Sequence, residues 1–438
     1  MLYNILVIGS GAREHALVKT LSLSKLDHNI FCIGSSHNPG IMELCMEYIV
    51  GDFNNPSFVA GYAIKNNINY AIIGPENPLE AGLADVLWDN NIKVIGPSKE
   101  LAMIETSKSF TRNLQADYKI PGAPMFKSFT SLSGVKEYFD ELNNEFVIKY
   151  DGLAGGKGVK VFGEHIITIS DALDYCNSLI KDGGSFVVEE KFVGEEFSLM
   201  SFCDGKNIQH MPIVQDHKRA YENDTGPNTG GMGTYSDSDH SLPFLQARDL
   251  EKAKKINTLT MQALKNKTGK DYIGILYGGF MAVKDGIKLI EYNARFGDPE
   301  AMNVLSILKT DLIDICIKMV SGDLDKIKIV FENKATVCKY SVPNGYPDDP
   351  VKDQLIDVSK IKNKEQIFYA SVDIINGELI ETGSRTLAVT SIAETIIDAE
   401  KSAEENIKKV KGPLFHRTDI GTQELIDRRK ANMEKIRC

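Results

Sequence analysis

Short apolar segments alternate with helical stretches over residues 1–104. Strands that alternate with helices predict a parallel, doubly wound α/β sheet, in which ligands bind at the carboxyl ends of the strands. All four predicted strands end at or next to a glycine, so the sequence favours a binding site along that edge. The predicted strands are 3–8, 29–33, 70–73 and 93–95, and the predicted helices between them are 14–22 and 79–90.

The pattern changes at a Pro/Gly boundary, 120–124, which follows a predicted helix at 99–118. We expect three domains, 1–104, 105–326 and 327–438, with a mobile lid at about 122–188. The later predicted strands are 145–149, 159–162, 185–190, 197–203, 276–283, 286–292, 335–341 and 366–375. The later predicted helices are 249–265 and an amphipathic one containing Ile392, Ile396, Ala399, Ala403 and Ile407.

The composition restricts the class of partner. The chain has 438 residues with 50 Lys+Arg against 60 Asp+Glu, a net charge of −10. Nucleic acids and anionic membranes need a basic face, so we expect neither as a partner. The seven Cys include no CxxC pair, the N-terminus lacks the basic region of a signal peptide, and no apolar run approaches the roughly 20 residues of a membrane helix. We therefore predict a soluble cytoplasmic protein that binds small molecules.

The first candidate motif is GSGARE at 9–14, which follows a predicted strand and begins a helix. Such a turn lets backbone N–H groups and a helix N-terminus bind a phosphate. It fails as a dinucleotide fingerprint, because Glu14 stands where a third glycine is needed and no acidic residue ends the second strand. A tight turn without a ligand is the alternative.

The second candidate motif is DGLAGGKG at 151–158, which lies between two predicted strands and follows Lys149. Its four glycines and Lys157 suit a mobile loop that folds over phosphates. It is not a Walker A loop, because Lys157 is followed by glycine and a strand rather than by Ser/Thr and a helix. A flexible surface hairpin is the alternative.

The third candidate motif is EYNARFGDPE at 291–300. On a strand, Glu291 and Asn293 point to the same face, and their oxygen atoms are ligands that Mg²⁺ prefers. Arg295, next on that face, could hold a substrate carboxylate with two hydrogen bonds. A solvated strand edge is the alternative.

The fourth candidate is the long segment 215–233, which is dense in Gly, Thr and Asn. Segments of this kind are either functional or disordered. Its two charged clusters and the apolar Met232 favour a function.

Together these segments resemble the ATP-grasp ligases, most closely the phosphoribosylamine–glycine ligase family. The resemblance implies an N-terminal substrate-binding domain, an ATP-grasp core with a lid, and a small C-terminal α+β domain. The implied reaction is ATP-dependent ligation of glycine to 5-phosphoribosylamine through a glycyl phosphate, which gives glycinamide ribonucleotide, ADP and phosphate in purine biosynthesis. It rests on GSGAREHAL, GPENPL, KYDGLAGGKGV, QDHKRAYENDTGPNTGGMG, EYNARFGDPE, GSRTLAV and HRTDIG, which cover nearly the whole chain in the family's order.

The resemblance also implies roles for individual residues. The implied ATP ligands are Lys108 and Lys149 for phosphates, Gly155, Gly156 and Lys157 in the lid loop, Glu189 and the Phe192 backbone for adenine, and Glu196 for ribose. The implied substrate ligands are Gly9 and Gly11 for phosphate, Glu14 and Glu76 for ribose hydroxyls or the amine, and Arg295 and Asp216 for glycine. The implied metal ligands are Glu291 and Asn293, for Mg²⁺ or Mn²⁺, and the implied catalytic residues are Arg295, Lys157 and Asp216.

Some alternatives stay open. The strand YGGFMAV at 277–283 lacks the second acidic metal ligand that many ATP-grasp enzymes carry there. An ATP-grasp carboxylase acting on a purine-pathway ribonucleotide is the alternative function, and a non-catalytic nucleotide-binding module or, more weakly, a nicotinamide-dependent oxidoreductase would be a different class. Either the segment 339–346 or the pair Ser384-Arg385 helps close the nucleotide site, or the C-terminal domain is a scaffold. We expect a monomer or weak homo-oligomer.

Overall fold

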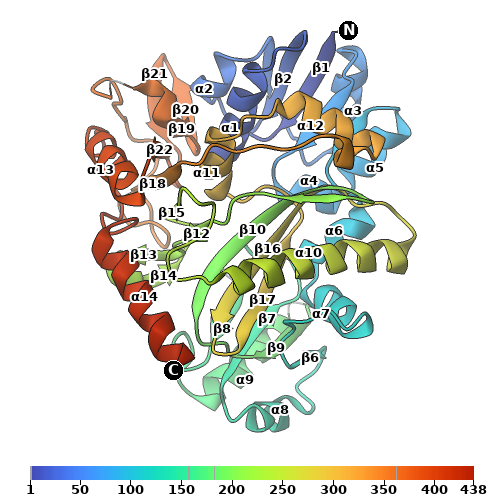
Figure 1. Ribbon diagram of the computed structural model, residues 1–438, viewed down its shortest axis with the longest axis vertical. Helices are drawn as coiled ribbons and strands as arrows, with labels where there is room; N and C mark the ends of the chain where they lie inside the picture. Colours follow the sequence, from blue (N-terminus) through green and yellow to red (C-terminus); the bar gives the residue numbers. More distant parts are fainter. Residues whose placement is uncertain (1, 156–157, 182, 362) are drawn as a thin grey trace.

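The computed structural model describes residues 2–155, 158–181, 183–361 and 363–438. Its N-terminal part is a five-stranded parallel sheet in the order β3-β2-β1-β4-β5, seen at the top of Figure 1. This confirms the predicted doubly wound sheet. The strands are β1 (Tyr3–Ile8), β2 (His28–Gly34), β3 (Glu47–Val50), β4 (Tyr70–Ile73) and β5 (Lys93–Ile95), and the helices are α1 (Ala12–Ser22), α2 (Pro39–Met42), α3 (Pro56–Lys65), α4 (Glu76–Ala81) and α5 (Leu83–Asp89).

The strand order places one crevice between β1 and β4. The chain runs outward from β1 to β2 and β3 and then returns to β4 on the other side of β1. Ligands of doubly wound sheets bind beyond the carboxyl ends of the strands at such a reversal. The edge strand β3 was missed from the sequence, because none of its four residues is fully buried and its apolar signal is weak.

Two helices, not one, follow the N-terminal sheet. The predicted continuous helix at 99–118 was wrong, since α6 (Lys99–Thr106) and α7 (Lys108–Asp117) are separated at Ser107. Ser107 has extended backbone angles, φ −132° and ψ 116°, and its hydroxyl accepts a hydrogen bond from Phe110 N at 3.1 Å. A serine N-cap of this kind starts a new helix. The break leaves Glu105 and Lys108 on either side of one turn.

The central part contains two antiparallel sheets. The larger has the order β11-β10-β16-β17, and the smaller, at the bottom of Figure 1, has the order β6-β9-β7-β8. The larger sheet comprises β10 (Glu195–Asp204), β11 (Ile208–His210), β16 (Ile273–Val283) and β17 (Gly286–Asn293), with α10 (Ala247–Thr268) packed on it. The smaller comprises β6 (Phe126–Phe129), β7 (Phe146–Tyr150), β8 (Val159–Val161) and β9 (Phe186–Glu190), with α8 (Val135–Glu141) and α9 (Ile169–Lys181). Further helices, α11 (Glu300–Ser306) and α12 (Leu312–Ser321), follow β17.

The C-terminal sheet joins strands that are distant in sequence. Its order is β12-β15-β18-β22-β19, so the segment before α10 pairs with strands more than a hundred residues later. Its strands are β12 (Gln215–Asp216), β15 (Gly233–Ser236), β18 (Ala335–Pro343), β19 (Ile367–Tyr369) and β22 (Leu387–Ala393), and β23 (Leu414–Phe415) also pairs with β18. Two small hairpins stand apart, β13 (Arg219–Tyr221) with β14 (Thr225–Asn228), and β20 (Val372–Ile375) with β21 (Glu378–Glu381).

Two predictions in the C-terminal region were wrong in detail. The strand expected at 366–375 is two strands in different sheets, β19 and β20. The amphipathic helix, α13 (Ile396–Ile407), begins after Ile392, which lies in β22 and is 42% exposed. A last helix, α14 (Gln423–Arg437), runs down the left side of Figure 1.

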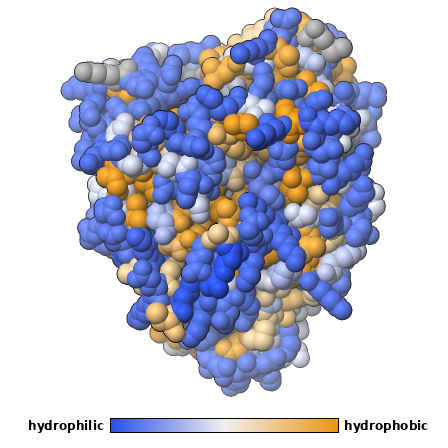
Figure 2. Space-filling view, in the orientation of Figure 1, coloured by the Kyte–Doolittle hydropathy of each residue, from blue (hydrophilic) through white to orange (hydrophobic). Residues whose placement is uncertain are grey.

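The distribution of hydrophobic and hydrophilic residues is that of a folded protein with several domains. On the face in Figure 2, hydrophilic residues predominate and hydrophobic residues form small scattered groups. The largest buried clusters join the N-terminal sheet to the central sheet and to the C-terminal strands. Among the helices of the described ranges, none is long and apolar enough to cross a membrane.

Candidate active site

A cavity of about 930 Å³ lies where the three parts of the chain meet. Nine residues predicted from the sequence line it, and they come from the N-terminal sheet, both central sheets and the C-terminal sheet, or from segments next to them. These are Glu76, Lys108, Lys149, Gly155, Glu196, Asp216, Glu291, Asn293 and Arg295. Gly9, Gly11, Glu14, Glu189 and Phe192 are described but are not among its lining residues. Gly156 and Lys157 lie outside the described residues.

Lys149 is held in the cavity wall by a buried ion network. Its Nζ lies 2.8 Å from Glu189 Oε2 and donates to Ile290 O at 2.8 Å. Arg112 binds the same carboxylate with two hydrogen bonds, Nε to Oε1 at 2.6 Å and Nη2 to Oε2 at 2.9 Å. Burial alone would raise the pKa of Glu189, but the two cations lower it. Glu189 therefore orients Lys149, and its side chain is already used in this network.

Glu291 and Asn293 sit at the end of β17 on one face, as predicted, and both line the cavity. Lys218 Nζ lies 3.4 Å from Glu291 Oε1 and 3.9 Å from Glu196 Oε2. Burial opposes the charge on Glu291, but Lys218, Lys108 and Lys149 lower its pKa to about 2. The carboxylate is therefore ionised and faces cations.

This donor set fits a hard divalent cation. Carboxylate and amide oxygens suit Mg²⁺, which usually takes few protein ligands and shares the rest of its shell with phosphates and water. No group of three or more His, Cys, Asp or Glu that could hold a metal occurs in the described part of the chain. A cation bound by Glu291 and Asn293 would therefore need ligands from a nucleotide as well.

Arg295 lies between two carboxylates in the cavity wall. Its Nη2 is 3.0 Å from Glu105 Oε1, and its Nε is 3.4 Å from Glu76 Oε2. Burial raises the pKa of Glu105, and Arg295 opposes this rise. For Glu76 burial is outweighed by Arg295 and Arg13, which lower its pKa. Glu105 was not identified from the sequence, because no motif marked it.

Asp216 faces the cavity beside a second acid. Burial and the neighbouring Glu300 raise the pKa of Asp216, whereas Lys218 and Arg385 oppose the rise. Its Oδ1 accepts a hydrogen bond from His217 N at 2.7 Å. A cation bound next to Asp216 would favour its ionised form.

Arg385 reaches the cavity from the C-terminal sheet. It donates to Gly230 O at 2.7 Å and to Asp298 O at 2.9 Å, and its guanidinium lies over the Tyr340 ring. Ser384 also lines the cavity. Of the two alternatives drawn for the C-terminal region, the geometry favours a contribution to the site over a remote scaffold.

Glycines after β1 and β4 make room for Glu14. Glu14 Oε2 accepts from Gly11 N at 2.7 Å, and Oε1 lies 2.5 Å from Arg13 Nε. A Cβ at Gly74 would lie 2.0 Å from Glu14 Oε1, and Gly9 has a positive φ of 112° with its Cβ position 2.8 Å from Glu14 Cδ. The turn is thus built around a buried carboxylate that uses the N–H of Gly11.

The start of the Gly-rich loop is tied to the break between α6 and α7. Asp151 accepts hydrogen bonds from Ser107 Oγ at 3.0 Å, from Ser109 N at 3.1 Å and from Ser109 Oγ. Lys108 Nζ, on the same turn, donates to Gly152 O at 3.3 Å. The loop therefore begins from a fixed point next to a lysine of the cavity.

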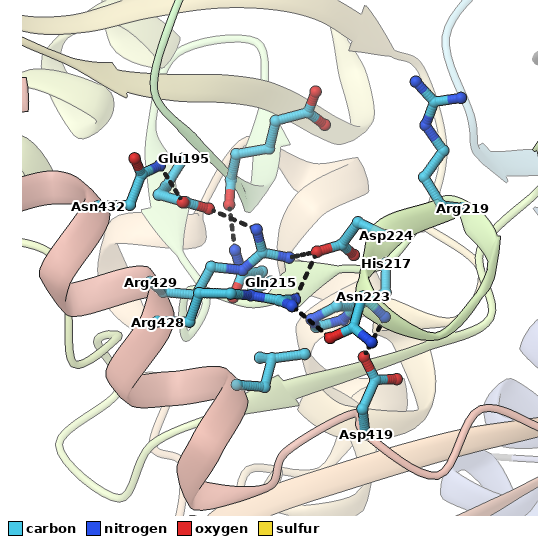
Figure 3. A network of polar contacts seen from close by, with 12 residues as sticks. Glu195, Gln215, His217, Arg219, Asn223, Asp224, Asp419, Arg428, Arg429 and Asn432 are labelled. Atoms are coloured by element: carbon cyan, nitrogen blue, oxygen red, sulfur yellow. Dashed lines mark hydrogen bonds and ion pairs between the residues drawn. The ribbon is translucent and has the colours of Figure 1, made fainter. Parts of the chain in front are cut away.

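Helix α14 braces the segment that carries Asp216 and Lys218. Figure 3 shows Arg428 and Arg429 pointing from α14 to Asp224, while Arg429 and Asn432 reach Glu195. Arg429 Nη2 is 2.7 Å from Asp224 Oδ2, and its Nη1 is 3.0 Å from Glu195 Oε2. Arg417 adds a third contact to Asp224 at 3.1 Å. Glu195, like its neighbour Glu196, lines the cavity, so α14 contacts two segments of the cavity wall.

Several lining residues were missed as functional residues in the sequence. Lys218 and Arg13 stand inside motifs that were singled out, so proximity to those motifs could have found them. Asp298 and Glu300 also lie within the third motif, whereas Glu105 and Arg429 reach the site only through tertiary packing.

Comparisons with known proteins cover almost the full chain. Three domain descriptions of one family match in order: Phosphoribosylglycinamide synthetase, N domain at residues 3–105, ATP-grasp (A) domain at 106–301, and C domain at 336–423. Phosphoribosylamine–glycine ligase of Methanocella arvoryzae is 47% identical over 433 residues, 99% of each chain. That of Methanococcus vannielii is 48% identical over 442 residues, again 99% of each. The crystal structure of phosphoribosylamine–glycine ligase from Thermotoga maritima has a TM-score of 0.81 at 26% identity and covers 95% of this chain and 100% of that one.

Proposed function

Because this chain belongs to the phosphoribosylglycinamide synthetase family and contains its ATP-grasp domain, we propose that it ligates glycine to 5-phosphoribosylamine at the expense of ATP. The products are glycinamide ribonucleotide, ADP and phosphate. The observation that carries the proposal is the single cavity lined by Lys108, Lys149, Glu291 and Arg295, which sets phosphate-binding cations, oxygen ligands and a carboxylate-binding arginine around one space.

The reaction proceeds in two balanced steps. A carboxylate oxygen of glycine attacks the γ-phosphorus of ATP, which forms glycyl phosphate and releases ADP. The amine of phosphoribosylamine then attacks the acyl carbon, a C–N bond forms, the C–O bond to phosphate breaks, and the amine loses a proton. Sites for phosphoryl transfer act mainly by positioning and charge neutralisation, and good positioning can supply roughly 7–11 kcal/mol.

The nucleotide lies along Lys108, Lys149 and the Gly-rich loop that begins at Asp151. Lys149 is fixed by Glu189 and Arg112, so its ammonium group needs no reorganisation when phosphate arrives. Glu196, which lies on the cavity side of β10, binds the ribose hydroxyls. Gly155, Gly156 and Lys157 of the loop contact the phosphates of ATP. Glu189 and the Phe192 backbone contact the adenine.

Glycine lies between Arg295 and Asp216. Arg295 holds the carboxylate, because the contacts to Glu105 and Glu76 use only part of its five N–H donors. Asp216 pairs with the ammonium group. The phosphate of phosphoribosylamine lies at the turn of Gly9 and Gly11, and Glu76 contacts its amine or ribose. Because the Glu14 carboxylate already accepts the Gly11 N–H, Glu14 contributes by holding the shape of this turn.

Glu291 and Asn293 would hold Mg²⁺ or Mn²⁺. Such an ion neutralises phosphate charge and orients the γ-phosphoryl group. Glu291 is kept ionised by Lys218 for this purpose. We also propose a cytoplasmic location, a monomer or weak homo-oligomer, and the domain limits 1–104, 105–326 and 327–438.

One assay tests the proposal. ADP release is measured with ATP, glycine and 5-phosphoribosylamine together, and then with each omitted. We expect ADP release to need glycine and product to need all three. Release that depends on bicarbonate instead of glycine would identify a carboxylase, and ATP binding without turnover under any acceptor would identify a binding module.

A further inference from the structure

One carboxylate contacts three consecutive residues at the end of β17, through a backbone hydrogen bond, an ion pair and a side-chain amide. Glu105 Oε2 accepts from Ala294 N at 2.7 Å, and Glu105 Oε1 lies 3.0 Å from Arg295 Nη2. The Asn293 amide is satisfied when its nitrogen donates to Glu105 Oε1 at 3.1 Å and to Tyr292 O at 3.3 Å. Glu105 is 4% exposed and lines the cavity.

The contact with Asn293 fixes which atom of the amide is available. With its nitrogen directed to Glu105, the amide oxygen is left to act as an acceptor or metal ligand. Two acceptors favour this orientation, Tyr292 O and the Glu105 carboxylate, and the carboxylate is the charged and closer of the two. Glu105 thus selects the ligand face of Asn293 in the way that outer carboxylates orient metal ligands.

The contact with Arg295 fixes the guanidinium. Arg295 also donates to Phe296 O at 3.2 Å and lies near Glu76, so its plane is set from three directions. A long side chain that is held in this way loses less entropy when it binds a carboxylate. Glu105 therefore orients both Asn293, a candidate metal ligand, and Arg295, the candidate ligand of the glycine carboxylate.

We propose that Glu105 is a positioning residue that holds Asn293 and Arg295 in register at the end of β17. Because the assigned roles of those two residues come from the proposed function, this inference rests on it. Glu105 acts through both residues, and it couples binding of the divalent cation to binding of glycine.

The test is Glu105→Gln in the full-length protein, which keeps the shape but removes the charge. We expect the glycine KM to rise about tenfold or more and the Mn²⁺ affinity of the ADP complex, measured by electron paramagnetic resonance titration, to fall about tenfold. The matched control is Glu100→Gln on the same helix, whose partner Lys270 lies 2.9 Å away at the surface. This control is expected to change neither quantity.

A double variant separates positioning from a general structural role. If Glu105 acts through Arg295, Glu105→Gln together with Arg295→Lys raises the glycine KM by less than the product of the two single effects. Glu105→Asp, which keeps the charge, is expected to retain part of the Mn²⁺ affinity. Unchanged glycine KM and Mn²⁺ affinity in folded Glu105→Gln, or loss of fold in both single variants at Glu105, would overturn the proposal.

Failure of the proposed function gives a different result. If the wild-type protein releases no ADP in response to glycine but Glu105→Gln still weakens Mn²⁺ binding, the ligase assignment falls and the effect of Glu105 on Asn293 stands. If the wild-type protein is an active ligase and the variant matches it in both measurements, the ligase assignment stands and the positioning role falls.

Discussion

Asp224 provides the sharpest test of how the C-terminal helix supports the site. Its carboxylate contacts Arg429, Arg428 and Arg417 at 2.7, 2.9 and 3.1 Å. Asp224→Asn replaces one oxygen with an NH₂ group that faces donors. The Arg429 side chain is 16% exposed, and its contact with Asp224 is worth about 1.5–3 kcal/mol as a charge-assisted hydrogen bond. The Arg428 side chain is more exposed, and its contact is worth at most about 1 kcal/mol.

The expected loss in unfolding free energy is therefore about 1.5–4 kcal/mol. It stays below the cost of a stranded buried charge, because Arg429 keeps Glu195 and Arg417 keeps Asp419. Urea unfolding measures this loss, and we expect a raised KM for ATP since Glu196 adjoins Glu195. The control is Asp117→Asn, whose pair with Lys267 has a 56% exposed carboxylate.

The pH dependence gives an independent check on the same carboxylate. Burial opposes ionisation of Asp224, but Arg429, His217 and Arg417 lower its pKa. A depressed pKa in the folded state stabilises the protein above the unfolded value of about 3.9, and this contribution is lost as pH falls through the folded value. The difference in unfolding free energy between the wild type and Asp224→Asn should thus narrow in acid. A loss below about 0.5 kcal/mol at pH 7 would refute the bracing role.

Three further predictions concern the site itself. Arg295→Lys should raise the glycine KM about tenfold, because one point charge replaces a fork; steady-state kinetics with varied glycine decide this. Glu291→Gln should lower turnover about 100-fold or more without loss of fold, and near-normal turnover would reject the metal assignment. Glu189→Gln should lower the unfolding free energy by about 3–5 kcal/mol, because it leaves Arg112 and Lys149 buried without their carboxylate partner. Since the pKa of Glu189 is lowered in the folded state, the difference from wild type should shrink below about pH 4. An unchanged urea midpoint would contradict this prediction.

Local pattern predicted most of the N-terminal sheet and the strand ends of the site. Apolar runs bounded by glycine identified β1, β4 and β5 with their observed limits. Period-two alternation also placed Glu291 and Asn293 on one face of β17, because that geometry belongs to the strand itself.

Tertiary contacts could not be predicted in the same way. The break at Ser107 depends on a single side chain that caps α7, inside a segment whose spacing is helical throughout. The pairing of β15 with β18 joins residues that no local pattern links. Glu105 and Arg429 were missed for the same reason, since each reaches the cavity from an element whose own sequence carries no signal of chemistry.

The net charge of −10 does not prevent this chain from binding two phosphorylated substrates, because the cavity cations are supported individually. Lys149 is anchored by Glu189, Lys218 by Glu291, and Arg295 by Glu105. The carboxylate of each pair reduces the long-range attraction between the cation and an anionic substrate, but it also holds the cation in place. At short range, a fixed hydrogen-bond donor in a partly desolvated cavity has a larger effect than a distant excess of surface carboxylates. The acidic surface therefore disfavours polyanions, while small anions meet fixed cations once they enter the cavity.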